Sequence, residues 1–244
     1  MTMDFTLTKY KALLDALDGC EQVVLRHDVD KKPKNSLATA YIEREMGWTA
    51  TYYFRTVPES FDPAVILQIA SLGHAIGYHY ESLATCKGNM EAAYQDFCCN
   101  LEKLRTLVPV TSMVMHGSPT SKWDSRDLWK HYDYHKLGID ADAFLDTDFS
   151  KVFYLTDTGR RWDGYKVSVR DKVPGSQEEW TAKGWVYHTT DEVIQAIKEG
   201  SFPQSVQVNT HPQRWTDNRY QWLKELLLQS GKNLVKRLVV RNYL

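Results

Sequence analysis

Two acidic side chains, Asp28 and Asp30, stand one residue apart in the segment Arg26-His27-Asp28-Val29-Asp30. In an extended backbone successive side chains point to opposite faces, so both carboxylates would lie on one side and Val29 on the other. Two carboxylates this close repel each other unless a cation or a shared proton compensates them. The pattern is typical of a metal site, although aspartates after a strand also cap helices and form turns.

Three histidines, His79, His116 and His211, each follow a short apolar run. Imidazole beside carboxylate oxygen suits Zn²⁺ or another divalent first-row ion, and an open coordination position lowers the pKa of a bound water. Imidazole is also the usual general acid for a leaving amine, which is the role considered for His211. A structural role is the ordinary alternative for a strand histidine. For His116 a ligand, a substrate hydrogen bond and a plain turn all stay open.

The elements that must position these side chains alternate between strand and helix. The sequence predicts strands at 22–25, 50–54, 75–78 and 112–115 and helices at 5–17, 36–46, 62–72 and 89–107. Weaker patterns indicate strands at 143–145, 152–154 and 205–209 and helices at 191–199 and 218–228. Such alternation predicts parallel strands with right-handed crossovers, in a doubly wound sheet or a (β/α) barrel. Both folds place function at the carboxyl ends of the strands, where the acids and imidazoles fall.

Length and charge narrow the class of protein. A chain of 244 residues suits one domain, which we expect to span 1–244. Thirty basic and 31 acidic residues leave a charge of −1, which argues against a nucleic-acid partner. The sequence has no apolar stretch long enough for a bilayer and no leader-like start, so we expect a cytoplasmic protein without a transmembrane segment.

The motifs, taken in order, resemble those of the polysaccharide deacetylases and their nodulation-type relatives. They are LRHDVD at 25–30, WTATYYF at 48–54, GHAIGYHYES at 73–82 and THP at 210–212, so the likeness runs from about Val23 to His211. The resemblance implies an α/β fold, a distorted (β/α) barrel of the polysaccharide deacetylase type. Aspartates separated by one residue match the branch that includes undecaprenyl aminoarabinose deformylases.

The resemblance also implies residue roles. Asp28 corresponds to the catalytic base, Asp30 and His79 to metal ligands, and His211 to the catalytic acid. The ion would be Zn²⁺, with Co²⁺, Ni²⁺ or Mn²⁺ as alternatives.

One position departs from the family pattern. Family members carry a second histidine four residues after the first, where this chain has Leu83. His116 or Glu81 would have to complete the ligand set; we predict His116 as the ligand and Glu81 as a substrate contact.

A basic and aromatic patch at Arg160, Arg161 and Trp162 is a further candidate for substrate binding. Paired arginines usually mark a solvated loop. In a barrel of this type they could instead bind an anionic carrier, because guanidinium matches phosphate geometry.

The predicted function is metal-dependent hydrolysis of an N-acyl group, most simply acetyl, from a sugar or a carrier-linked sugar in surface polysaccharide metabolism. The first alternative is a non-catalytic carbohydrate-binding protein on a degenerate deacetylase scaffold, which Leu83 favours. The second is a deformylase or ureide amidohydrolase on the same barrel.

Overall fold

A single sheet of parallel strands forms the centre of the molecule. The computed structural model describes residues 3–117, 121–162, 173 and 175–241. Within them the sheet has seven strands in the order β5-β4-β3-β2-β1-β7-β6, and every neighbouring pair is parallel. The strands are β1 Gln22–Val29, β2 Ala50–Phe54, β3 Ala75–Tyr80, β4 Ser112–Met115, β5 Ala141–Asp142, β6 Phe153–Thr156 and β7 Ser205–Thr210.

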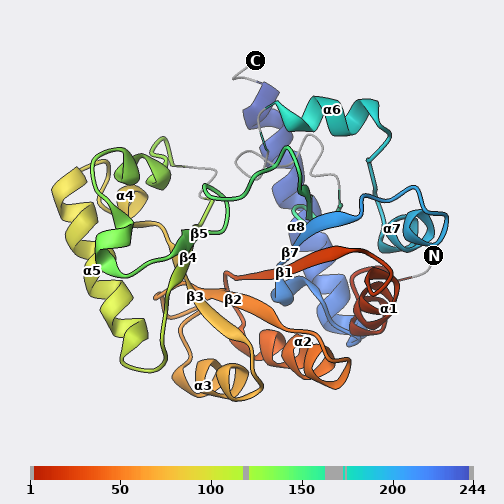
Figure 1. The fold of residues 1–244 in the computed structure, drawn as a ribbon, viewed down its shortest axis with the longest axis horizontal. Helices are drawn as coiled ribbons and strands as arrows, with labels where there is room; N and C mark the ends of the chain where they lie inside the picture. The colour runs from red at the N-terminus through yellow and green to blue at the C-terminus, as the bar shows by residue number, and fades with distance from the viewer. Residues whose placement is uncertain (1–2, 118–120, 163–172, 174, 242–244) are drawn as a thin grey trace.

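The sheet is curled, and its two outer strands, β5 and β6, are the open edges (Figure 1). The result is an incomplete barrel. Strand β1 is an inner strand of the sheet and pairs with β2 on one side and β7 on the other. The prediction of an α/β fold built as a distorted barrel of parallel strands is confirmed.

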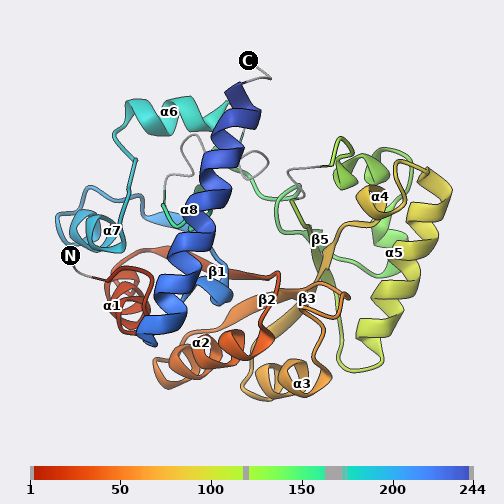
Figure 2. The same ribbon diagram turned by 180° about the vertical axis from the view of Figure 1, so that it is seen from behind.

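Helices flank the strands on the outside of the curl. They are α1 Leu7–Leu17, α2 Pro33–Glu45, α3 Pro63–Ser71, α4 Ser82–Thr85, α5 Met90–Arg105, α6 Ser176–Ala182, α7 Thr190–Lys198 and α8 Arg219–Arg241, with 3₁₀ turns η1 Ser125–Lys130, η2 Tyr134–Leu137 and η3 Pro212–Arg214. Figure 2, the view from behind, shows α8 crossing in front of the strands, and its Glu225 pairs with Lys31 and Lys32. Over the described residues, no helix is both long and apolar enough to span a membrane.

Most predicted elements are found close to their expected bounds. Strands β2 and β4 coincide with the predictions, whereas β1 continues through Val29 and so includes the Arg26–Val29 segment. The predicted strand at 143–145 is wrong. Residues 143–145 form a turn, because Oδ1 of Asp142 accepts the backbone N–H groups of Phe144 (2.8 Å) and Leu145 (3.0 Å).

Strand β1 is polar on both faces, although its carboxyl half is buried. On the face toward α1 and α2, His27 contacts Glu43 of α2 and Thr210 of β7. On the inner face Asp28 contacts side chains of β1 and β7. The alternation expected of a strand therefore separates two polar clusters by one layer of backbone.

Candidate metal and catalytic site

Asp28 is a buried carboxylate held by an arginine of its own strand. Arg26 lies two residues earlier and thus on the same face, and its Nε and Nη2 donate to the two Asp28 oxygens at 2.9 and 2.7 Å. Asn209 of β7 donates its Nδ2 to Oδ2 at 3.0 Å. Burial alone would raise the pKa of Asp28, but the charge of Arg26 outweighs it and lowers the pKa. Asp28 is therefore ionised at neutral pH.

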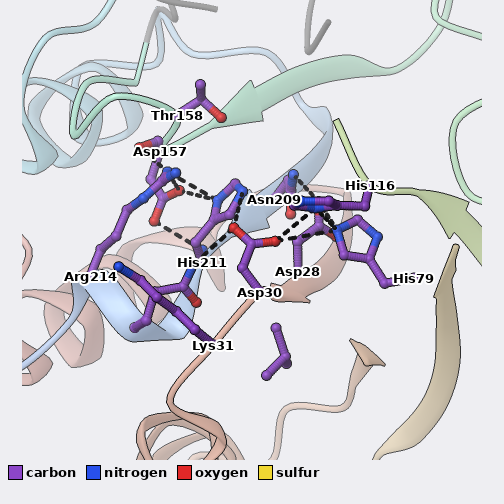
Figure 3. A network of polar contacts seen from close by, with 12 residues as sticks. Asp28, Asp30, Lys31, His79, His116, Asp157, Thr158, Asn209, His211 and Arg214 are labelled. Atoms are coloured by element: carbon purple, nitrogen blue, oxygen red, sulfur yellow. Dashed lines mark hydrogen bonds and ion pairs between the residues drawn. The ribbon is translucent and has the colours of Figure 1, made fainter. Parts of the chain in front are cut away.

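Asp30, His79 and His116 converge at the carboxyl ends of β1, β3 and β4 (Figure 3). Oδ1 of Asp30 lies 3.5 Å from Nε2 of His79 and 3.1 Å from Nδ1 of His116. The two imidazole nitrogens are 3.2 Å apart. All three atoms lie within 4.8 Å of one another, which is close enough for one ion to bind them together.

The polar atoms of this cluster are arranged as ligand atoms. Nδ1 of His79 lies 3.1 Å from the carbonyl oxygen of Val114, which can only accept, so Nδ1 carries the proton and Nε2 presents its lone pair to the cluster. Oδ1 of Asp30 is buried and has no hydrogen-bond partner. Burial would raise the pKa of Asp30, but the nearby charge of His116 outweighs it and lowers the pKa well below its usual range. One carboxylate oxygen and two imidazoles fit a divalent first-row ion.

His211 lies beside this cluster and is oriented by Asp157. Its Nδ1 is 2.6 Å from Oδ1 of Asp157, and its backbone N–H donates to Oδ2 at 3.0 Å. Its other ring nitrogen, Nε2, faces Oδ2 of Asp30 at 3.9 Å (Figure 3). The carboxylate thus fixes the ring so that Nε2 points to the cluster, an arrangement suited to proton transfer.

Asp157 is itself fully buried and surrounded by donors. Arg214 donates its Nη1 to Oδ1 at 2.7 Å, and Trp215 donates its Nε1 to Oδ2 at 2.8 Å. Burial alone would raise the pKa of Asp157, but the charges of Arg214 and His211 and the hydrogen bonds from His211 lower it. Asp157 therefore stays anionic and can stabilise a positive charge on His211.

Glu81 lies at the same rim but outside the cluster. Its Oε1 accepts from Nε and Nη2 of Arg55 at 2.9 and 2.5 Å. Nη1 of the same arginine donates to the carbonyl oxygen of Asp30 at 3.2 Å. Glu81 is thus linked to Asp30 only through Arg55. The structure brings together the five residues predicted as ligands, base and acid, which are Asp28, Asp30, His79, His116 and His211.

The patch at 160–162 lies next to the residues that orient His211, because the backbone N–H of Arg160 donates to the carbonyl of Asp157 at 2.9 Å and its Nη1 donates to the carbonyl of Arg214 at 3.4 Å. Arg160 lies over the rings of Phe5 and Trp222, each centroid 5.2 Å away, and donates to the carbonyl of Asp4 at 3.3 Å. Trp162 is 2% exposed and donates to Oγ1 of Thr190. Arg161 contacts His188. Arg160 and Trp162 are thus buried among aromatic rings and backbone carbonyls, and a substrate-binding role for this patch stays a prediction.

Several residues of the site were not predicted. Asp157, Arg214 and Gln213 had no assigned role, and neither did Arg26 and Asn209 as partners of Asp28. A signal existed for Asp157, an acid three residues after the predicted strand at 152–154, and for Arg26, which shares a strand face with Asp28. The others depend on contacts between distant parts of the chain.

Comparison with known proteins gives limited matches. No protein-family model matches the chain. A segment of 90 residues is 32% identical to vacuolar protein sorting/targeting protein 10 of Laccaria bicolor, covering 36% of this chain and only 6% of that protein's length.

Solved structures with similar folds include family 4 carbohydrate esterases. The Streptococcus mutans CE4 esterase has a TM-score of 0.47 at 15% identity, covering 93% of this chain and 86% of that one. The Bacillus anthracis enzyme has a TM-score of 0.44 at 11% identity, covering 90% and 84%. The Streptomyces lividans enzyme, in complex with acetate, has a TM-score of 0.43 at 14% identity, covering 88% and 91%.

Proposed function

We propose that the protein is a metal-dependent hydrolase that removes an N-acyl group, most simply acetyl, from a sugar. The observation that carries the proposal is one arrangement of five side chains. Asp28 and His211 flank the cluster of Asp30, His79 and His116, with Asp28 next to His79 and His211 next to Asp30 (Figure 3). A base and an acid on either side of a cation site is what hydrolysis of an amide requires.

The three clustered residues would hold a divalent ion such as Zn²⁺, with Co²⁺, Ni²⁺ or Mn²⁺ as alternatives. When bound, such an ion polarises an acyl carbonyl and lowers the pKa of a water beside it. Oδ1 of Asp30, which has no hydrogen-bond partner, and Nε2 of His79, whose lone pair faces the cluster, support this assignment. Leu83, at the position of the missing second histidine, is packed in the hydrophobic core at 1% exposure. His116, which lies in the cluster with Asp30 and His79, would act as the third ligand instead.

Asp28 is the group that accepts the proton of the attacking water. Its carboxylate is kept ionised by Arg26, and Oδ1 accepts one hydrogen bond, so a lone pair remains for the water proton. As the water oxygen bonds to the acyl carbon, that proton moves to Asp28.

His211 is the group that protonates the leaving amine. Asp157 holds the ring by Nδ1 and compensates the positive charge that the ring carries before it releases its proton from Nε2. The C–N bond then breaks with the amine leaving as a neutral group, and the acyl group leaves as a carboxylic acid.

The sugar substrate is proposed from the ordered motifs of the sequence, and a carrier-linked sugar of surface polysaccharide metabolism fits the same motifs. A formyl or ureide substrate would use the same machinery. The product distinguishes them, because a formamide substrate releases formate and an acetamide substrate releases acetate.

The decisive variant is Asp28→Asn. Wild-type protein loaded with Zn²⁺ or Co²⁺ should release acetate from N-acetylated chitooligosaccharides or from an N-acetylated aryl-amide substrate. Asp28→Asn should retain the ion while turnover falls about 10²- to 10⁴-fold, the usual contribution of a general base. The exposed Asp148→Asn serves as the matched control and should keep full activity. A fully active Asp28→Asn protein contradicts the assignment of the base.

A further inference from the structure

Gln213 binds the oxygen of Asp30 that does not face the imidazole cluster. It lies in η3, directly after His211 and Pro212, and is 3% exposed. Its Nε2 donates to Oδ2 of Asp30 at 3.0 Å. An ionised carboxylate has no proton to give, so the NH₂ end of the amide must be the end that faces it.

Arg55 holds the backbone of the same residue. It follows β2, and its Nη1 donates to the carbonyl oxygen of Asp30 at 3.2 Å, while Glu81 binds the rest of its guanidinium. The neighbouring connection adds a second link, because Oγ of Ser60 donates to the carbonyl of Val29 and accepts the N–H of Arg55 at 3.1 Å. Two residues of the β2–α3 connection, Arg55 and Ser60, thus bind the carbonyl oxygens of Asp30 and Val29.

These contacts matter because Asp30 lies beyond the last residue of β1, Val29. Without the sheet ladder, its backbone and the rotation of its carboxylate must be fixed by other groups. Gln213 fixes Oδ2 and Arg55 fixes the main chain, and Oδ1 is left to point at His79 and His116.

We infer that Gln213 and Arg55 are positioning residues that hold Asp30 in its ion-binding orientation. Neither side chain belongs to the clustered ligand atoms, so each acts through Asp30. The inference rests on the proposed function, since it presumes that Asp30 binds an ion. Partners that orient a ligand of this kind contribute about 10- to 100-fold to metal affinity.

The test is a titration of the metal-free protein with Co²⁺, which reports affinity and coordination by visible absorption without any turnover. Gln213→Met keeps the length of the side chain and removes the donor. We expect about 10- to 100-fold weaker Co²⁺ binding and an altered absorption spectrum. The matched control is Gln207→Met, because Gln207 is also 3% exposed, but its Nε2 donates to the carbonyl of Ala143. Its Co²⁺ affinity should equal that of the wild type.

Arg55→Lys is the second variant and keeps a charge for Glu81 while losing the forked guanidinium that also reaches Asp30. It should also weaken Co²⁺ binding, and it decides the question if Gln213→Met does not fold. Wild-type affinity in both folded variants overturns the positioning role. A wild-type protein that binds no ion overturns the proposed function as well, so the two failures are distinguishable.

Discussion

The two faces of β1 carry the same kinds of residues but differ in how fully those residues are paired. On the outer face, Nδ1 of His27 lies 2.6 Å from Oγ1 of Thr210 and Nε2 lies 2.6 Å from Oε1 of Glu43. The second oxygen of Glu43 accepts from Tyr52 at 2.6 Å, and Tyr10 donates to the first. Each polar atom of this buried histidine and acid has a partner.

The inner face leaves one buried carboxylate oxygen without a partner. Oδ1 of Asp30 has no hydrogen bond, and Nε2 of His79 lies 3.5 Å from it. Polar groups buried without partners are costly, so their retention at one convergent point indicates a ligand. The outer cluster is therefore structural, because its polar atoms all have hydrogen-bond partners. The inner cluster is the functional candidate, because it gathers potential ligand atoms and leaves one of them without a partner.

The largest effect is expected from the inner face. His211→Gln removes the acid and should lower the rate of acyl release about 10²- to 10⁴-fold. Co²⁺ affinity should change little, because His211 is not among the three clustered ligand residues. Rate assays and Co²⁺ titration on the same preparation measure the two quantities. A variant with a wild-type rate would remove His211 from the mechanism.

On the outer face the expected effect is on stability. Glu43→Ala leaves His27, Tyr10 and Tyr52 without their shared acceptor, and loss of one partner of a buried pair typically costs about 3–5 kcal/mol. Urea unfolding of the metal-free protein measures this loss. Asp30→Asn is the inner-face counterpart and should abolish Co²⁺ binding with a smaller loss of stability than Glu43→Ala, because the asparagine amide oxygen can still accept from Gln213. Equal destabilisation by both would erase the distinction between the faces.

The outer face also predicts a dependence of stability on pH. Burial alone would raise the pKa of Glu43, but His27 and the hydrogen bonds from Tyr10 and Tyr52 lower it below its usual 4.5. A lowered folded pKa contributes stability that is present above the unfolded pKa and is lost as pH falls through the folded pKa. Urea midpoints below pH 4.5 should therefore fall less steeply in Glu43→Gln than in the wild type. Identical slopes would show that Glu43 does not contribute.

The smallest effect is expected at the 160–162 patch. Arg161 contacts His188, and its neighbours Arg160 and Trp162 are buried. Arg161→Ala should leave the KM for an N-acetylated sugar within about twofold of the wild-type value, as for most surface substitutions. A large rise in KM would restore the sequence-based prediction that this patch binds substrate.

The sequence predicts the positions of the site better than its pairings. Strand alternation and strand-end placement suffice to bring Asp28, Asp30 and His79 to one rim, because both rules are local. The Asp157–His211 contact joins residues 54 positions apart, and no local pattern encodes it.

The same limit explains the patch at 160–162. Its charges are visible in the sequence, but the rings of Phe5 and Trp222 that cover Arg160 come from the two ends of the chain. Likewise, Leu83 signals a missing ligand, whereas the adjacency of β3 and β4 that brings His116 to His79 emerges only from the folded sheet.

The most direct test is a crystal structure of the protein soaked with Zn²⁺, with anomalous data collected at the zinc edge. The account predicts one strong peak bound by Oδ1 of Asp30, Nε2 of His79 and Nδ1 of His116, each at about 2.0–2.2 Å. A fourth position should stay open toward Asp28 and His211. Absence of the peak, or a peak held by other side chains, would contradict the proposal that this convergence is a metal site.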